Sequence, residues 1–106
     1  MVTALDAHQL IANGALLLDV REDDEFAAGR SADARQIALA SLPDHLASLD
    51  VNRPIVCVCR SGGRSARATE FLIEHGFSAV NLEGGMTAWH DAGLEMIADD
   101  GDPIVA

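Results

Sequence analysis

Hydrophobic and polar positions alternate along the chain in stretches typical of strands interleaved with helices. A short, nearly continuous apolar run at residues 15–20 predicts a strand buried on both faces, and the β-branched, apolar run at 54–58 gives the strongest strand signal. Further strands are predicted at 77–82 and, over a short stretch, at 35–38. Stretches with helical spacing separate these runs, and several end at a glycine. Since strands that alternate with helices form mostly parallel sheets, we expect an α/β fold with a central sheet and helices on both faces.

The first helix is predicted to begin after Thr3, which can cap it, and to run to about Asn13. Leu5, Leu10 and Ile11 are expected to face the core. Further helices are predicted at about residues 22–28, 41–49, 65–75 and 86–92.

The end of the chain lacks any periodic pattern. We therefore expect one domain over residues 1–93, followed by a loosely attached, acidic C-terminal tail at residues 94–106. A chain of 106 residues with 49% hydrophobic residues is large enough for one core without disulfides or metals.

The charge of the chain limits its partners. The net charge of −10 should repel nucleic acid and anionic lipid, so we expect neither as a partner. No apolar run approaches the roughly 20 residues of a membrane span, and the N-terminus lacks the pattern of an ordinary secretory signal. Cys57 and Cys59 are too close for an unstrained disulfide, so they are expected to be free thiols in a reducing, cytoplasmic compartment.

Cys59 ends the predicted strand 54–58 and precedes a glycine-rich loop that leads into a helix. Glycines let the backbone curl so that N–H groups and the positive end of the helix face the sulfur. Such a setting lowers the pKa of a cysteine and makes it nucleophilic, whereas the alternative for Cys59 is a small buried hydrophobic residue. The loop consists of Arg60, Ser61, Gly62, Gly63, Arg64 and Ser65.

Other side chains are expected near this loop. The carboxyl ends of parallel strands meet at one edge of a sheet, which would bring Asp19 and Glu83 to the same edge as the loop. Arg60 and Arg64 can bind an anion, although Arg64 can equally brace the loop through carboxylates. Cys57 is expected to pack in the core, with a role as a resolving thiol as the alternative. The histidines lack metal-ligand spacing, so no metal site is expected.

The sequence Cys-Arg-Ser-Gly-Gly-Arg-Ser at residues 59–65 resembles the active-site loop of the rhodanese family. Leu18-Asp19-Val20-Arg21 resembles the family's strand that ends in Asp-x-Arg, and the resemblance extends from Thr3 to Gly93. One segment departs from it, because residues 29–34 lack the His, Pro and second Gly of the family's Gly-His-Ile-Pro-Gly-Ala. Further matches are Glu25-Phe26 with Gly29, Gly76-Phe77, Leu82-Glu83-Gly84-Gly85, Trp89 and Gly93.

The resemblance implies a rhodanese-like three-layer sandwich and a sulfurtransferase that needs no cofactor. Cys59 would be the catalytic residue, taking a sulfane sulfur from a small anionic donor such as thiosulfate and passing it, as a persulfide, to a thiol or cyanide acceptor. The loop residues 60–65 would bind the donor, and Asp19 and Arg21 would form an ion pair that supports the loop. A protein can take the place of either the donor or the acceptor.

Two other functions stay open. Phosphatases and arsenate reductases of the same fold carry one more residue between the cysteine and the arginine of the loop than the four found here. The shorter loop suits a sulfur atom better than a tetrahedral phosphoryl group. A non-catalytic sulfur-relay or binding module is the second alternative. Inactive relatives usually lack the cysteine, so the presence of Cys59 argues against an inactive binding module.

Overall fold

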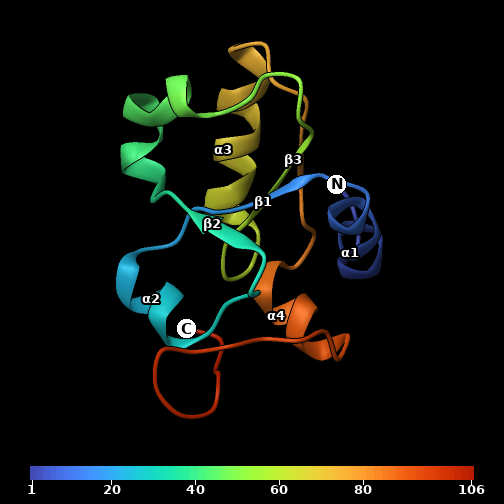
Figure 1. Cartoon of the computed structure of the whole chain (residues 1–106), viewed down its shortest axis with the longest axis vertical. Coiled ribbons are helices and arrows are strands. Elements are labelled where there is room, and N and C mark those ends of the chain that lie inside the picture. Colours follow the sequence, from blue (N-terminus) through green and yellow to red (C-terminus); the bar gives the residue numbers. More distant parts are fainter.

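A computed structural model describes all residues, 1–106, and contains a four-stranded sheet in the order β2-β1-β3-β4 (Figure 1). All neighbouring strands are parallel, as the alternation of strands and helices predicted. The two middle strands are buried along their whole length, which agrees with their continuous apolar runs. The strands are β1 (Leu16–Asp19), β2 (Ala34–Gln36), β3 (Ile55–Val58) and β4 (Ala79–Asn81).

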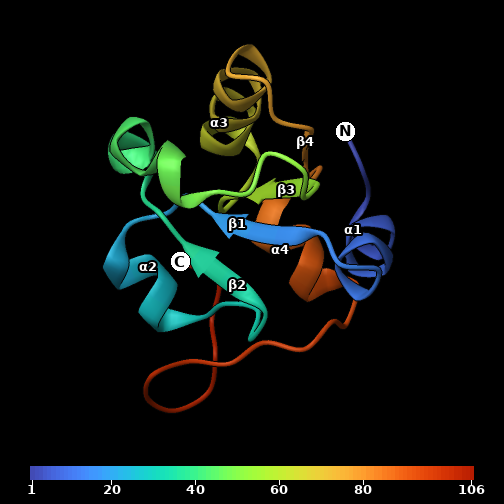
Figure 2. The same cartoon turned by 45° about the horizontal axis from the view of Figure 1, so that its top comes forward.

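Helices cover both faces of this sheet, so the predicted three-layer α/β sandwich is confirmed (Figure 2). One core lies between the sheet and the elements η1 and α3, and the other lies between the sheet and the helices α1 and α4. No helix is both long enough and apolar enough to cross a membrane. The helices are α1 (Ala4–Ala12), α2 (Asp23–Ala28), the 3-10 helix η1 (Leu39–Ser48), α3 (Gly63–Glu74) and α4 (Gly85–Asp91).

Helix α1 begins where the sequence predicted, but it presents a different face to the core. The Oγ1 of Thr3 accepts a hydrogen bond from the N–H of Asp6 at 3.1 Å and so caps the helix. Leu5 is 64% exposed and Leu10 is also exposed, whereas Ala4 and Ala7 are buried. The prediction for these leucines was wrong because small alanine side chains let the helix lie close to its neighbours.

The predicted helix at residues 41–49 is a 3-10 helix that begins two residues earlier, at Leu39. Pro43 lies inside it and has no N–H to donate to a carbonyl four residues back. The tighter 3-10 turn does not depend on that α-helical hydrogen bond.

The C-terminal segment, residues 94–106, is not loosely attached as predicted; it runs to the C-terminal end of α2, makes a loop and returns to that end (Figures 1 and 2). We call this segment the strap. Arg30 and Ile97 form an antiparallel bridge with N···O distances of 2.9 and 2.8 Å. The N–H of Ile104 donates to the carbonyl of Ala28 at 3.0 Å, and Arg30 pairs with Asp99 at 2.8 Å. These contacts use mainly backbone groups, which leave no periodic pattern in the sequence. The division at residue 93 stays a prediction.

Gly29→Ala tests this attachment, because a methyl group at residue 29 would collide with the backbone carbonyl of Ile104. We expect the strap to move away, with a loss of about 1–3 kcal/mol in the free energy of unfolding and faster cleavage within residues 94–106 in limited proteolysis. Gly63→Ala is the matched control, because a methyl group there meets no atom within 4 Å. A strap as well protected in Gly29→Ala as in the control would contradict the attachment.

Candidate active site

The Cys59 sulfur lies at the carboxyl end of β3, enclosed by the loop that follows it. The residue is 1% exposed. The N–H of Gly62 points at Sγ with an N···S distance of 3.1 Å, and the hydroxyl of the buried Ser65 donates to the same atom at 3.3 Å. The sulfur thus accepts hydrogen bonds from both the loop and the first turn of α3.

The loop reaches this shape through a left-handed residue at the start of α3. Gly62 has φ +114° and serves as the N-cap residue of the helix, which begins at Gly63, two residues before the predicted start. A side chain at residue 62 would strain the backbone, so glycine is required for the turn. The turn brings the positive end of the 12-residue helix α3 close to Cys59.

Residues of helix α4 donate hydrogen bonds to the carbonyl groups of the loop. The carbonyl of Cys59 accepts from the N–H of Met86 at 2.8 Å, and the carbonyl of Arg60 accepts from the N–H and the hydroxyl of Thr87 at 3.1 and 3.2 Å. In a trans peptide the C=O and N–H point in opposite directions, so fixing these carbonyls toward α4 turns the N–H of Ser61 toward the sulfur. Gly85 permits the approach, since a methyl group there would collide with both carbonyls.

These contacts change the acidity of Cys59. Burial by itself raises the pKa of the thiol, but hydrogen bonds from the Ser65 hydroxyl and from the N–H groups of Ser65, Gly62 and Ser61 outweigh it and lower the pKa below its usual value. Cys57 behaves in the opposite way: burial raises its pKa to about 11. It is fully buried in the core between the sheet and α3, which confirms the expected packing role.

The two arginines of the loop differ in their contacts. Arg64 donates from both terminal nitrogens to the carboxylate of Glu25 at 2.6 and 2.7 Å, and these bonds lower the pKa of Glu25 to about 2. Of the two roles expected for Arg64, the bracing contact is therefore present. Arg60 is exposed and has no ion-pair partner. Donor binding by either residue stays a prediction.

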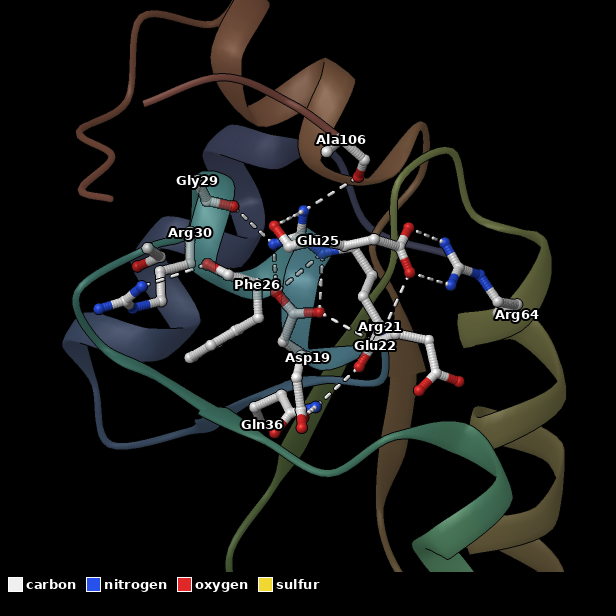
Figure 3. A network of polar contacts seen from close by, with 12 residues as sticks. Asp19, Arg21, Glu22, Glu25, Phe26, Gly29, Arg30, Gln36, Arg64 and Ala106 are labelled. Carbon is white, nitrogen blue, oxygen red and sulfur yellow. Dashed lines mark hydrogen bonds and ion pairs between the residues drawn. The ribbon is translucent and has the colours of Figure 1, made fainter. Parts of the chain in front are cut away.

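Asp19 and Arg21 form the expected ion pair, with both side chains fully buried and an N···O distance of 2.7 Å (Figure 3). The guanidinium of Arg21 also donates to the carbonyls of Gly29, Glu25 and Ala106 at 2.7, 3.3 and 3.2 Å. It therefore joins β1 to α2 and to the strap. That this pair supports the loop stays a prediction.

The structure adds residues that the sequence reasoning did not assign to the site. Thr87 and Asn81 both contact loop carbonyls, and Glu25 holds Arg64. Only Glu25 carried a signal, as part of the segment that resembles the family. Glu83, expected at the same edge, has an exposed side chain with no hydrogen bond to the loop.

Comparisons with known proteins identify rhodanese-like proteins and sulfurtransferases as similar to this chain. The sequence model of the rhodanese-like domain family matches residues 3–92. A protein named sulfurtransferase from Allochromatium vinosum is 36% identical over 95% of this chain and 100% of its own length. The thiosulfate sulfurtransferase GlpE of Pseudomonas aeruginosa is 39% identical over 78% of this chain and 76% of its own. The crystal structure of a rhodanese-related protein from Thermoplasma volcanium has a TM-score of 0.85 and 31% identity, covering 91% of this chain and 95% of that one.

The acidity of Cys59 can be measured from the ultraviolet absorbance of its thiolate as a function of pH. We expect a midpoint below about 8.5, the value of a free cysteine, because the hydrogen bonds favour the charged form. The thiolate, and with it reactivity, should be present above this midpoint and be lost as the pH falls through it. Cys57, whose pKa is about 11, does not interfere in this range. A midpoint at or above about 8.5 would contradict the site geometry.

Proposed function

The chain belongs to the rhodanese-like family of sulfurtransferases, and we propose that it transfers a sulfane sulfur as a persulfide on Cys59, from an anionic donor such as thiosulfate to a thiol or cyanide. The observation that carries this proposal is the convergence of hydrogen-bond donors on one sulfur, with Gly62 at 3.1 Å and Ser65 at 3.3 Å. Such donors stabilise an anionic thiolate before reaction and an anionic persulfide after it.

In the first step, the Cys59 thiolate attacks the outer sulfur of thiosulfate. A bond forms between Sγ and that sulfur, and the bond from it to the sulfonate sulfur breaks. Sulfite leaves with the electron pair of the broken bond, so the total charge is unchanged. The product is a Cys59 persulfide whose terminal sulfur bears the negative charge. The N–H groups of the loop and the first turn of α3 face that charge.

In the second step, a thiolate or cyanide attacks the terminal sulfur of the persulfide. The new bond joins the acceptor to this sulfur, and the electron pair of the S–S bond returns to Sγ, which regenerates the Cys59 thiolate. No proton has to be held by a separate base, because both the nucleophile and the leaving group are anions. Sulfur transfer through a covalent intermediate predicts ping-pong kinetics.

Two further observations, on the cysteines and on the loop arginines, support the proposal. Two thiols that form no disulfide favour a reducing, cytoplasmic compartment. Arg60 is free of carboxylates, whereas the charge of Arg64 is neutralised by Glu25. We therefore assign the first contact with an anionic donor to Arg60. A persulfide on another protein can serve as the donor by the same steps.

Cys59→Ser tests the proposal directly. We expect the wild-type protein to gain the mass of one sulfur atom at Cys59 after incubation with thiosulfate, and Cys59→Ser to gain none and to lose thiosulfate:cyanide sulfurtransfer. Cys57→Ala is the control and should keep most of its activity, because Cys57 is buried in the core. Normal turnover by Cys59→Ser, or phosphate-ester hydrolysis without any sulfur uptake by the wild type, would refute the proposal.

Arg60→Ala is expected to weaken the use of thiosulfate. Losing one charge-assisted contact should lower kcat/KM by roughly 10- to 100-fold, mainly through KM, because the contact acts on the bound donor. Arg67→Ala is the matched control: this arginine is exposed on α3 and likewise forms no ion pair, and its loss should change kcat/KM far less. Equal effects of the two substitutions on steady-state kinetics would show that Arg60 acts only through the overall charge.

A further inference from the structure

Asn81, the last residue of β4, makes a contact with the loop that its place in the strand does not require. The residue is 6% exposed. Its Nδ2 donates to the carbonyl of Gly62 at 3.1 Å. Its Oδ1 is the one buried side-chain nitrogen or oxygen atom of the chain without a hydrogen-bond partner.

The unpartnered Oδ1 indicates that packing alone does not explain an asparagine here. A buried amide oxygen without a donor is unfavourable, and an apolar side chain of similar size would avoid that cost. What an apolar side chain cannot supply is the hydrogen bond from Nδ2 to the Gly62 carbonyl. The role of Asn81 is therefore to be sought in that bond.

Gly62 needs such a partner because it has no side chain of its own. Its N–H is aimed at Cys59 Sγ, while its carbonyl accepts from Asn81 and, at 3.1 Å, from the N–H of Ala66. Glycine populates several backbone conformations with similar ease, so its orientation is set by what its two peptide groups bind. Without Asn81, the carbonyl would keep only its bond within the first turn of α3.

We propose that Asn81 is a positioning residue, which fixes Gly62 so that its N–H stays aimed at the reacting sulfur of Cys59. This inference rests on the proposed role of Cys59 as the sulfur carrier. Asn81 forms no hydrogen bond with the sulfur of Cys59, whose donors are Gly62 and Ser65, and it acts through Gly62. Loss of the aimed N–H destabilises the thiolate and the persulfide, which carry charge, more than the neutral thiol.

The charged groups at this end of the sheet stay in place when Asn81 is replaced. Arg60 and Arg64 belong to the loop, Glu25 on α2 holds Arg64, and the Asp19–Arg21 pair lies on the side of β1. Asn81 forms no hydrogen bond or ion pair with any of them. A change in the titration of Cys59 would therefore report on the Gly62 contact.

The test is the thiolate titration of Cys59 in Asn81→Leu, followed by ultraviolet absorbance. We expect the midpoint to rise enough that the thiolate fraction below the midpoint falls by about 3- to 10-fold, with a similar loss in kcat/KM for thiosulfate that lies in kcat rather than KM. Val80→Ala is the matched control, since it alters the neighbouring residue of the same strand, whose side chain packs toward the other core. It should lower the melting temperature and leave the midpoint unchanged.

An Asn81→Leu protein that loses melting temperature as Val80→Ala does, with an unchanged midpoint, would overturn the inference. If Asn81→Leu does not fold, Asn81→Ser decides in the same way, because its short side chain cannot reach Gly62. The titration needs no sulfur transfer. A wild type that titrates low but takes up no sulfur would refute the proposed function alone, and a shifted midpoint in the variant would still support the role of Asn81.

Discussion

The guanidinium of Arg21 is fully buried, so its charge must be paired and its N–H groups must be bonded by the protein instead of by water. The groups that do so hold β1, α2 and the strap together. Asp19 supplies the opposite charge from the end of β1, and the carbonyls of Glu25 in α2, of Gly29 just after it and of Ala106 accept the remaining N–H groups. A helix of six residues has little stability of its own, so these bonds to Glu25 and Gly29 fix where it lies. Its position in turn decides where Glu25 meets Arg64.

The sulfur site itself is built from neutral groups. The carbonyls of the loop are bound by α4 and by Asn81, and the N–H groups therefore face Cys59. This matters in a chain with a net charge of −10, where an anion must be stabilised against the field of the whole molecule. Fixed dipoles in a buried site are screened little by salt and need no reorganisation during the reaction. The exposed Arg60 carries a full positive charge without a carboxylate partner, which is why we propose it as the first contact for an anionic donor.

The sequence predicted those features that follow from periodicity or from local backbone chemistry. The runs that became β1 and β3 are apolar because both faces of each strand are covered, and Gly62 is needed for the left-handed turn that follows Cys59. Contacts between a side chain and a distant carbonyl have no such signature. Asn81 and Thr87 were missed for this reason, and the strap was taken as loose although its backbone is bonded to α2. The prediction that the leucines of α1 face the core was wrong because Ala4 and Ala7 pack against it instead, and alanine is only a weak hydrophobic signal in a sequence.

Residues 29–34, which depart from the family's pattern, contact the strap in this chain. In this chain the turn is closed by Ser31, whose carbonyl and hydroxyl accept from the N–H groups of Ala34 and Asp33 at 3.1 and 3.3 Å. Arg30, just before it, is held by its bridge to Ile97 and its ion pair with Asp99. Gly29 is retained where a side chain would collide with Ile104. The turn thus takes part of its support from residues 94–106 rather than from a proline and a second glycine of its own. Since Gly29 also accepts from Arg21, the same strap contributes to the surroundings of the buried charge.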